Sequence, residues 1–229
     1  GTARGLRIAT DEKIDVIAAS VNLAGLHMAS DIDFNRKSFT TGHTGFGMPF
    51  MTNPDRSDVP RSAARPLRYM DRYVTVNQGE VFFVTEMLAS LEGIERGPAG
   101  NTSLAAAFAL AQEYSQDDVI VVQETEYTGA GKHHQAQLAF AKTMGIDVRF
   151  GDPEEEIPGK SIVLPDSAGK IRAREYDLDR ARRSLIRNAT QRADFLTADD
   201  LDFLAAEVNR DREYVQEVLR EINKKWEEN

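Results

Sequence analysis

A glycine-containing loop after the most apolar stretch of the chain is the first candidate for chemistry. The loop runs from Thr125 to His133 and contains Thr128, Gly129 and Gly131. It lies between a predicted strand and a predicted helix, where open α/β sheets bind ligands and where free backbone amides favour anions. The glycines are equally suited to a plain strand-to-helix turn. Position alone therefore makes the loop a candidate site.

The same loop contains half of a nucleotide-binding motif. A Walker A loop has a glycine, four residues, then Gly-Lys and a serine or threonine whose hydroxyl holds magnesium. Gly131 and Lys132 fit, but Glu126 stands at the first glycine position and His133 replaces the hydroxyl residue. An acidic residue is unfavourable beside phosphates, so a P-loop-like nucleotide-binding protein is the weaker alternative.

A second candidate loop spans residues 40–47, TTGHTGFG, and includes His43, Gly45 and Gly47. Glycines let the backbone approach a phosphate, a carboxylate or a flat ring closely, although such loops are often only turns. His43 has the chemistry of an acid or base near neutral pH. A single histidine more often makes a structural hydrogen bond. The four histidines do not have metal-ligand spacing, so we expect no metal site.

The third candidate is a cluster of arginines in an acidic chain. Residues 55–72 contain five arginines and three aspartates, whereas the whole chain has a net charge of -9. Helical spacing would put several of the arginines on one face, although Pro60 and Pro66 interrupt a regular helix. A salt-bridged surface and an anion site that includes Arg61 and Arg65 are equally compatible with this pattern.

Strands and helices alternate around these candidates, which predicts the α/β class. The run VIVVQ, residues 119–123, is apolar on both faces, as expected of a central parallel strand covered by helices. We expect an open, mostly parallel sheet with helices on both faces, followed by a helical C-terminal tail. The remaining predicted elements are strands near 13–21, 73–76, 146–150 and 162–165, and helices near 81–93, 102–115, 135–145, 177–189, 197–208 and 211–226.

Composition limits the function further. The chain has 229 residues and no cysteine, which excludes disulfides, thiolate nucleophiles and cysteine-ligated metals and fits a reducing compartment. Its net negative charge disfavours nucleic-acid binding. No apolar run approaches the length of a membrane helix and no signal peptide is evident. We expect a cytoplasmic protein that binds neither nucleic acid nor membrane.

Two stretches of the sequence resemble the carboxyl half of fold type II pyridoxal-phosphate enzymes. They are GPAGNTSLAAAFALA, from Gly97, and VIVVQETEYTGAGKHH, from Val119. In the threonine-synthase branch of that family, a Thr-Gly-x-Gly loop carries a hydroxyl that contacts the pyridine nitrogen, and Thr128 matches it. SFTTGHTGFG is similar to a glycine loop beside the cofactor in cysteine-synthase relatives. The resemblance implies that Thr128, Gly129, Gly131, Gly45 and Gly47 bind pyridoxal 5'-phosphate.

Three further motifs lie within residues 1–165, DFNRKSFTTGHTGFG, DVPRSAARPLRYMDRYVTV and RGPAGNTSLAAAFALAQE. Together they resemble the beta subunits of 2-amino-4-oxopentanoate thiolases, enzymes of ornithine degradation. The resemblance implies a transferase, an acyltransferase that cleaves 2-amino-4-oxopentanoate with coenzyme A to acetyl-CoA and alanine. It also implies that His43, Arg61 and Arg65 contact substrates and that a companion alpha subunit is present.

The family's Schiff-base lysine, asparagine loop and phosphate-binding loop would precede Gly1. We therefore expect residues 1–165 to be a partial pyridoxal-phosphate enzyme domain without its N-terminal half, and 170–229 to be a helical extension. The chain alone should then be inactive and need the missing half of the beta subunit. A noncatalytic or regulatory subunit derived from this fold remains the alternative within the family.

Overall fold

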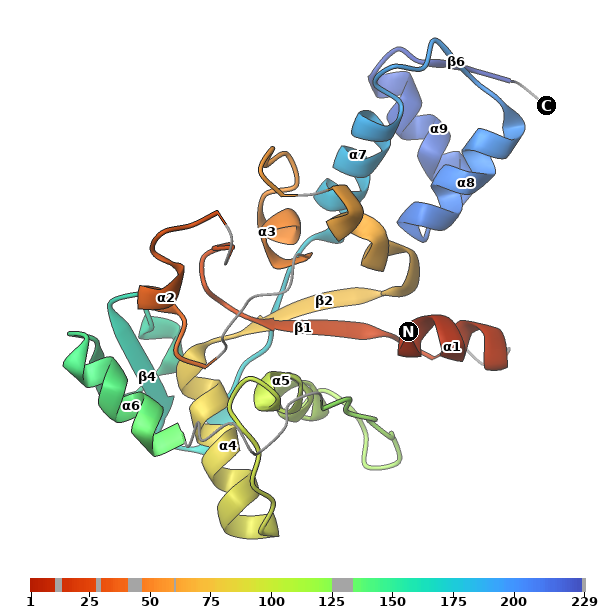
Figure 1. The fold of residues 1–229 in the computed structure, drawn as a ribbon. Helices are drawn as coiled ribbons and strands as arrows, with labels where there is room; N and C mark the ends of the chain where they lie inside the picture. The colour runs from red at the N-terminus through yellow and green to blue at the C-terminus, as the bar shows by residue number, and fades with distance from the viewer. Residues whose placement is uncertain (11–13, 28–29, 41–46, 60, 125–133, 228–229) are drawn as a thin grey trace. The chain divides into compact units, whose positions relative to one another are not determined.

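A computed structural model describes residues 1–10, 14–27, 30–40, 47–59, 61–124 and 134–227. The chain divides into two compact units. Unit 1 comprises Gly1–Ile17, Pro49–Tyr73 and Tyr176–Asn229, and unit 2 comprises Ala18–Met48 and Val74–Glu175. Figure 1 draws the elements of both units.

Unit 2 has the mixed α/β character expected from the sequence. Its principal helices are α2 (Phe34–Lys37), α4 (Gln78–Glu92), α5 (Asn101–Ala111) and α6 (His134–Thr143). Its strands are β1 (Ile17–Val21), β2 (Arg72–Val76), β3 (Asp147–Gly151), β4 (Ser161–Pro165) and β5 (Arg174–Glu175), and its short 3-10 helices are η3 (Pro153–Glu155) and η4 (Ala168–Lys170). Strands β1 and β2 begin at residues of unit 1.

The described strands form small sheets. β1, β2 and β5 make a three-stranded sheet in that order, in which β2 and β5 are antiparallel. β3 and β4 are parallel, in a register that places Asp147 opposite Ser161. A core between this pair and the helices contains Phe39, Phe82 and Ile162. Four of the five predicted strands are therefore present, as β1, β2, β3 and β4, but they are distributed over separate sheets in the described part of the chain.

The predicted central strand at 119–123 is absent. Residues 118–124 have no regular secondary structure and belong to none of the sheets formed by the described residues. The side chains of Val119 and Val121 are 87% and 89% exposed. A strand forms only when neighbouring strands pair with its backbone amides and carbonyls. None of the described strands pairs with residues 118–124.

Unit 1 is mainly helical. Its elements are α1 (Thr2–Ala9), α3 (Gly47–Thr52), the 3-10 helix η1 (Arg61–Tyr69), α7 (Leu178–Ala189), α8 (Ala198–Val208), α9 (Arg212–Glu221) and the short parallel pair β6 (Phe195–Leu196) and β7 (Lys225–Trp226). α3 starts two residues before the unit boundary. A core of aliphatic side chains from α7, α8 and α9 holds the C-terminal helices together, and the single tryptophan, Trp226, packs against it.

The C-terminal helices begin where the sequence predicts, because each is preceded by a capping residue. Asp177, Thr197 and Asp211 accept hydrogen bonds from backbone amides at the starts of α7, α8 and α9. The last helix is shorter than predicted. It ends at Glu221, and Asn223 has a φ of 55°, a left-handed conformation that stops a helix before β7.

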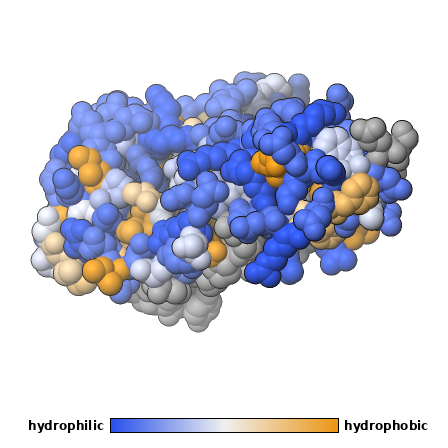
Figure 2. Space-filling model, turned by 90° about the horizontal axis from the view of Figure 1, so that it is seen from above, coloured by the Kyte–Doolittle hydropathy of each residue, from blue (hydrophilic) through white to orange (hydrophobic). Residues whose placement is uncertain are grey.

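The surface in Figure 2 is mostly hydrophilic, with small separate patches of hydrophobic side chains. None of the helices among the described residues has both the length and the apolar character needed to cross a membrane.

Candidate functional site

Helix α4 is the element on which the polar contacts of unit 2 converge. In Figure 1 it lies between α5 and α6, and it also contacts β4. The helix ends at Gly93, whose φ of 66° is a left-handed conformation that favours glycine. Gln78, Phe82 and Glu86 recur every four residues along α4 and so share one face of the helix.

Gln78 holds the chain at the entrance of the glycine loop that starts at Thr40. Its side chain is fully buried. Oε1 accepts hydrogen bonds from Phe39 N at 2.7 Å and Thr40 N at 3.2 Å, and Nε2 donates to Lys37 O at 2.7 Å. One side chain thus satisfies three backbone groups that are about 40 residues away in sequence. Removing it would leave these groups buried without partners.

The Thr40 hydroxyl is a polar group without a protein partner. Thr40 is 2% exposed, and its Oγ1 has no hydrogen-bond partner in the structure. The preceding Phe39 packs in the core with Phe82, and its ring meets that of Phe140 on α6 edge-on at a centroid distance of 6.3 Å. Buried hydroxyls are nearly always hydrogen-bonded in proteins. An unsatisfied hydroxyl at the start of a glycine loop is therefore suited to contact a polar ligand atom.

Glu86 and His134 fix the position where the chain leaves the second glycine loop. His134 is the first residue of α6 and is 7% exposed. Its Nε2 lies in direct contact with Oε2 of Glu86 on α4. This pair connects α4 to the residue directly after Thr125–His133.

The entrance of that loop is held by Asn101, the first residue of α5, which is fully buried. With its amide oriented to satisfy both neighbours, Nδ2 donates to Glu124 Oε1 at 3.0 Å and Oδ1 accepts from Thr85 Oγ1 at 3.1 Å. Ser103 Oγ donates to Gln123 O at 3.0 Å. The residue at the cap position of α5 is Gly100, and the Asn101 side chain makes its hydrogen bonds with Glu124 and Thr85.

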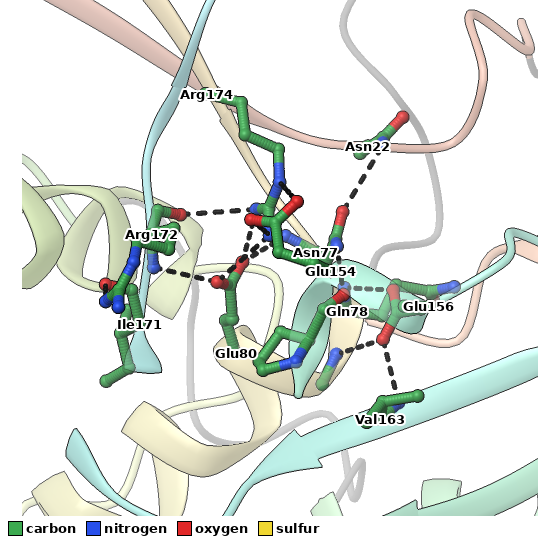
Figure 3. A network of polar contacts seen from close by, with 12 residues as sticks. Asn22, Asn77, Gln78, Glu80, Glu154, Glu156, Val163, Ile171, Arg172 and Arg174 are labelled. Carbon is green, nitrogen blue, oxygen red and sulfur yellow. Dashed lines mark hydrogen bonds and ion pairs between the residues drawn. The ribbon is translucent and has the colours of Figure 1, made fainter. Parts of the chain in front are cut away.

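The first turn of α4 is bound by a carboxylate from a distant segment (Figure 3). Glu156 accepts hydrogen bonds from Gln78 N at 2.7 Å, Gly79 N at 2.8 Å and Val163 N at 3.0 Å. The first amides of a helix have no partners within the helix and favour a negative charge. A Cβ at Gly79 would lie 1.9 Å from the Val163 carbonyl oxygen, so only glycine permits this close packing of α4 on β4.

A second carboxylate, Glu80, links α4 to the strand that ends unit 2 (Figure 3). Glu80 accepts from Asn77 N at 2.6 Å, Arg172 N at 2.8 Å and Arg174 Nη1 at 2.8 Å. Arg174 also donates to Glu154 at 2.7 Å. The ion pair gives the fully buried Glu80 side chain a charged partner, which a buried carboxylate requires.

Burial changes the acidity of both carboxylates. Desolvation raises the pKa of Glu156 to about 7, although three backbone hydrogen bonds oppose the shift. Desolvation also raises the pKa of Glu80 above its usual value, and the hydrogen bond and charge of Arg174 act in the opposite direction. These groups stabilise the start of α4.

The arrangement gives both glycine loops a common support. Gln78 holds the chain before the loop at 41–46, the Thr85–Asn101–Glu124 contacts hold the chain before the loop at 125–133, and Glu86 holds the chain after it. All of these residues belong to unit 2. Helix α4 therefore fixes the start of the first loop and the end of the second, and α4 and α5 together fix the start of the second.

The residues predicted to contact the cofactor fall mostly in the loops themselves. Thr128, Gly129, Gly131, Gly45 and His43 lie outside the described residues. Gly47 is the first residue of α3. The structure locates the flanks of both loops, and the predicted roles of these residues stay predictions.

The arginine cluster of residues 55–72, called the arginine window below, lies in unit 1. Two of its five arginines are in ion pairs. Arg61 begins η1, its side chain lying outside the described part of the structure, and Arg65 is exposed. Arg68 pairs with Glu207 at 2.7 Å and Arg56 pairs with Asp58 at 2.6 Å. The helical face expected from the spacing is interrupted, because Arg72 belongs to β2. For two of the five arginines, the salt-bridged surface is therefore the correct interpretation.

Across the described ranges, no cluster of three or more histidine, aspartate or glutamate side chains could hold a metal ion.

Sequence reasoning missed the residues that support the loops. Gln78, Glu86 and Glu156 were not identified as candidates. A weak signal for two of them exists in the sequence, because Gln78 and Glu86 are polar residues eight positions apart on the same face of a largely apolar helix. Glu156 has no such signal, since two of its three partners are 77 and 78 residues away.

Comparisons with known proteins give two close relatives. The chain is 64% identical over 224 residues to a 2-amino-4-ketopentanoate thiolase beta subunit of Acetoanaerobium sticklandii, and 62% identical over 224 residues to one of the same name from an unknown prokaryotic organism. Each match covers 97% of this chain and 48% of the relative.

The chain thus spans about half the length of the curated relatives it matches. No protein-family profile and no solved structure matches it. The resemblance predicted from the sequence is confirmed, and the coverage is consistent with a C-terminal half. Over nearly its whole length, the chain is similar to half of a 2-amino-4-ketopentanoate thiolase beta subunit.

Proposed function

We propose that this chain is the C-terminal part of a pyridoxal-phosphate-dependent thiolase of fold type II. The complete enzyme would cleave 2-amino-4-oxopentanoate with coenzyme A to acetyl-CoA and alanine. The observation that carries the proposal is the 64% identity to a thiolase beta subunit over 97% of the chain. The contacts of the described residues that flank both loops with α4 and α5 support it.

The described residues fit a flat, polar cofactor beside the two loops. The Thr40 hydroxyl is buried, lacks a protein partner and stands at the start of one loop. The second loop is held at both ends by polar contacts with α4 and α5. A ligand contacted by both loops would be oriented without movement of their ends, and such preorganisation favours catalysis.

Each part of the chain would then have a separate role. Pyridoxal phosphate, when bound, supplies an electron sink for the carbanion that forms when the bond next to the ketone is broken. Thr128 would offer a neutral hydroxyl to the pyridine nitrogen. Gly45, Gly47, Gly129 and Gly131 would allow the backbone to approach the ring. Phe39, next to Thr40, packs with Phe82 in an apolar core.

The arginine window would bind coenzyme A, whose phosphates suit the forked donors of arginine. Arg65 is exposed and its neighbours Arg56 and Arg68 are engaged in ion pairs. Arg61 and Arg65 are therefore the members of the window that we assign to the phosphates, and His43 is assigned to the amino-keto acid.

Activity would require residues outside this chain. The Schiff-base lysine is expected in the half of the beta subunit that this chain does not match, and an alpha subunit is expected as the companion. The 229 residues alone should therefore not catalyse thiolysis.

The test is to co-express the chain with the polypeptide that corresponds to the unmatched half and with the alpha subunit. The purified complex should show the visible absorbance of bound pyridoxal phosphate and release acetyl-CoA from 2-amino-4-oxopentanoate and coenzyme A. Thr128→Val should weaken cofactor binding roughly threefold to tenfold, the effect of losing one neutral hydrogen bond of about 0.5–1.5 kcal/mol.

The matched control is Thr143→Val at the end of α6, where the hydroxyl is exposed and donates to Phe140 O. This variant should bind the cofactor like the original. A complex that binds no pyridoxal phosphate, or a Thr128→Val variant with unchanged affinity and turnover, would contradict the assignment.

A further inference from the structure

Helix α7 and the residue before it form a second stretch of the chain in which positive charge collects. Residues 177–189 contain four arginines and two aspartates, and the arginine window contains five arginines and three aspartates. Each stretch therefore has a surplus of two positive charges, whereas the whole chain has a net charge of -9. Both stretches carry the sign of charge that the rest of the protein lacks.

The fold packs these two basic stretches against each other within unit 1. Helix α7 contacts η1, which lies beside it in Figure 1. The fully buried hydroxyl of Ser184 on α7 bonds to the Pro54 carbonyl at 3.1 Å and to Asp55 Oδ1 at 2.8 Å. Pro54 is 130 positions away from Ser184 in the sequence. The contact therefore fixes the beginning of the arginine window on α7.

Two arginines of α7 flank this contact. Arg180 and Arg187 are seven positions apart, so they lie on one face of the helix, next to the position of Ser184. Arg187 Nη2 is 3.7 Å from Asp55 Oδ1, which is too long for a hydrogen bond, and the Arg187 side chain is 40% exposed. The forked donors of Arg187 can therefore bind another acceptor beside the arginine window.

The remaining arginines of α7 face other helices. Arg183 is bound by three carboxylates of α7 and α9. Arg182 is 2% exposed and donates to Val208 O at the end of α8, but its Nη2 has no hydrogen-bond partner. Burial and the charge of Arg210 lower the pKa of Arg182. No carboxylate among the described residues forms an ion pair with Arg182, so its charge adds to the positive potential of α7.

Two basic stretches packed together favour an anion, because like charges that lie close together destabilise the folded chain. Within the described ranges, no carboxylate oxygen lies within hydrogen-bond distance of the guanidinium groups of Arg65, Arg180 or Arg187. An anion with several separate charges would contact donors of both stretches at once. Among the ligands of the proposed reaction, coenzyme A has this pattern, since it carries a diphosphate and a separate 3'-phosphate, whereas the amino-keto acid carries one carboxylate.

We propose that α7 forms a second side of the coenzyme A site, on which Arg180 and Arg187 bind phosphates together with Arg65 of the arginine window. The inference rests on the proposed function for the identity of the ligand. It gives the C-terminal helices a part in substrate binding. Because the phosphates lie far from the reacting thiol, these arginines contribute affinity for coenzyme A and not chemistry.

The experiment titrates adenosine 3',5'-bisphosphate, which has phosphates on both sides of the ribose as coenzyme A does, into the 229-residue chain in a calorimeter. Arg187→Ala should raise the Kd about tenfold, because a charge-assisted contact to phosphate is lost, and Arg180→Ala should raise it by a smaller factor. Arg187→Lys keeps the charge without the fork and should give an intermediate Kd. These differences should shrink as salt increases.

The matched control is Arg192→Ala, which removes the same charge from an exposed arginine in the turn after α7, where Lys224 donates to Ala193 O. It should keep the original Kd. Thermal unfolding should be similar for all the variants, since exposed ion pairs contribute little to stability. The inference is overturned if the chain does not bind the bisphosphate, if Arg187→Ala binds it as tightly as the original, or if Arg192→Ala weakens binding as much as Arg187→Ala.

The proposed function is decided separately, in the co-expressed complex. If the complex releases acetyl-CoA and Arg187→Ala leaves its KM for coenzyme A unchanged, the inference is overturned and the proposed function holds. If the bisphosphate binds in a manner that depends on Arg187, but the complex neither shows the absorbance of pyridoxal phosphate nor releases acetyl-CoA, the proposed function is contradicted and the phosphate site on α7 holds.

Discussion

The carboxylate of Glu156 binds the backbone amide of Gln78 at 2.7 Å, although the two residues are 78 positions apart. Through this bond and its neighbours at Gly79 and Val163, the segment after β3 holds the start of α4. The polar support of the glycine loops therefore depends on a carboxylate that is itself buried. Its protonation should affect the stability of unit 2.

Stability should depend on pH through Glu156. Its pKa is about 7 in the folded chain and near 4.5 when the chain is unfolded. The folded state therefore binds more protons between these values, so the contribution of this group is fully present below about pH 4.5, is lost as pH rises to about 7, and is constant above. The unfolding free energy should fall by roughly 3 kcal/mol at most, because the pKa difference between 4.5 and about 7 corresponds to about 1.4 kcal/mol for each pKa unit.

This dependence is measured by urea unfolding at several pH values between 4.5 and 8. Glu156→Gln should flatten the slope of the unfolding free energy against pH. Glu155→Gln, at the exposed neighbouring position, should keep the original slope. Equal slopes in all three proteins would show that Glu156 titrates near its ordinary pKa.

Gly79→Ala should destabilise the protein severely. The new methyl group would meet the Val163 carbonyl at 1.9 Å, and backbone cannot move aside cheaply. We expect a cost above about 3 kcal/mol or failure to fold, the upper range for overpacking. The control is Gly5→Ala in α1, where nothing lies within 4 Å of the added carbon. It should be neutral or slightly stabilising. Thermal unfolding distinguishes them, and similar losses at both positions would contradict the close packing.

Gln78→Met should loosen the entrance of the first glycine loop. The variant keeps the volume of the side chain but leaves the amides of Phe39 and Thr40 and the carbonyl of Lys37 unpaired. Unpaired buried groups cost about 1–3 kcal/mol each, and relaxation should limit the total to roughly 2–4 kcal/mol.

Hydrogen exchange of the Phe39 and Thr40 amides measures this effect locally, and urea unfolding measures it globally. Gln112→Met is the control, since Gln112 is exposed and its side-chain amide donates to Ile171 O at 3.2 Å. Unchanged exchange in Gln78→Met would mean that another group holds the loop entrance.

In the complete enzyme, Arg65→Ala should raise the KM for coenzyme A several-fold and leave kcat largely unchanged, because a phosphate contact far from the reacting thiol contributes uniform binding. The effect should shrink as salt increases. Arg36→Ala, at an exposed arginine paired with Asp33 in α2, is the control. If both variants have the KM of the original, the window has no role in binding coenzyme A.

The sequence predicts local elements better than their assembly. Helix α4 and the C-terminal helices follow from apolar spacing and from residues such as Thr197 and Gly93 that start or stop a helix locally. The segment 119–123 has an equally clear strand pattern, but a strand also needs partners from elsewhere. Composition shows only that its side chains are suited to burial.

The sequence likewise predicts the loops of the candidate site but not the residues that support them. Glycines and hydroxyls mark the two loops in the sequence. The residues that support the loops are ordinary glutamates, glutamines and asparagines, which are common on surfaces, and their contacts follow only from the folded arrangement. Gln78 and Asn101 have their roles because the fold encloses them.

The support of both loops by α4 constrains how the protein can change. Gln78 and Glu86 are eight residues apart, so the helix separates their attachment points by about 12 Å along its axis. A one-residue insertion between them would rotate Glu86 by about 100° and carry it away from His134, whereas exchanges of outward-facing residues would not alter this spacing. The number of residues in α4 between Gln78 and Glu86 should therefore tolerate neither insertion nor deletion.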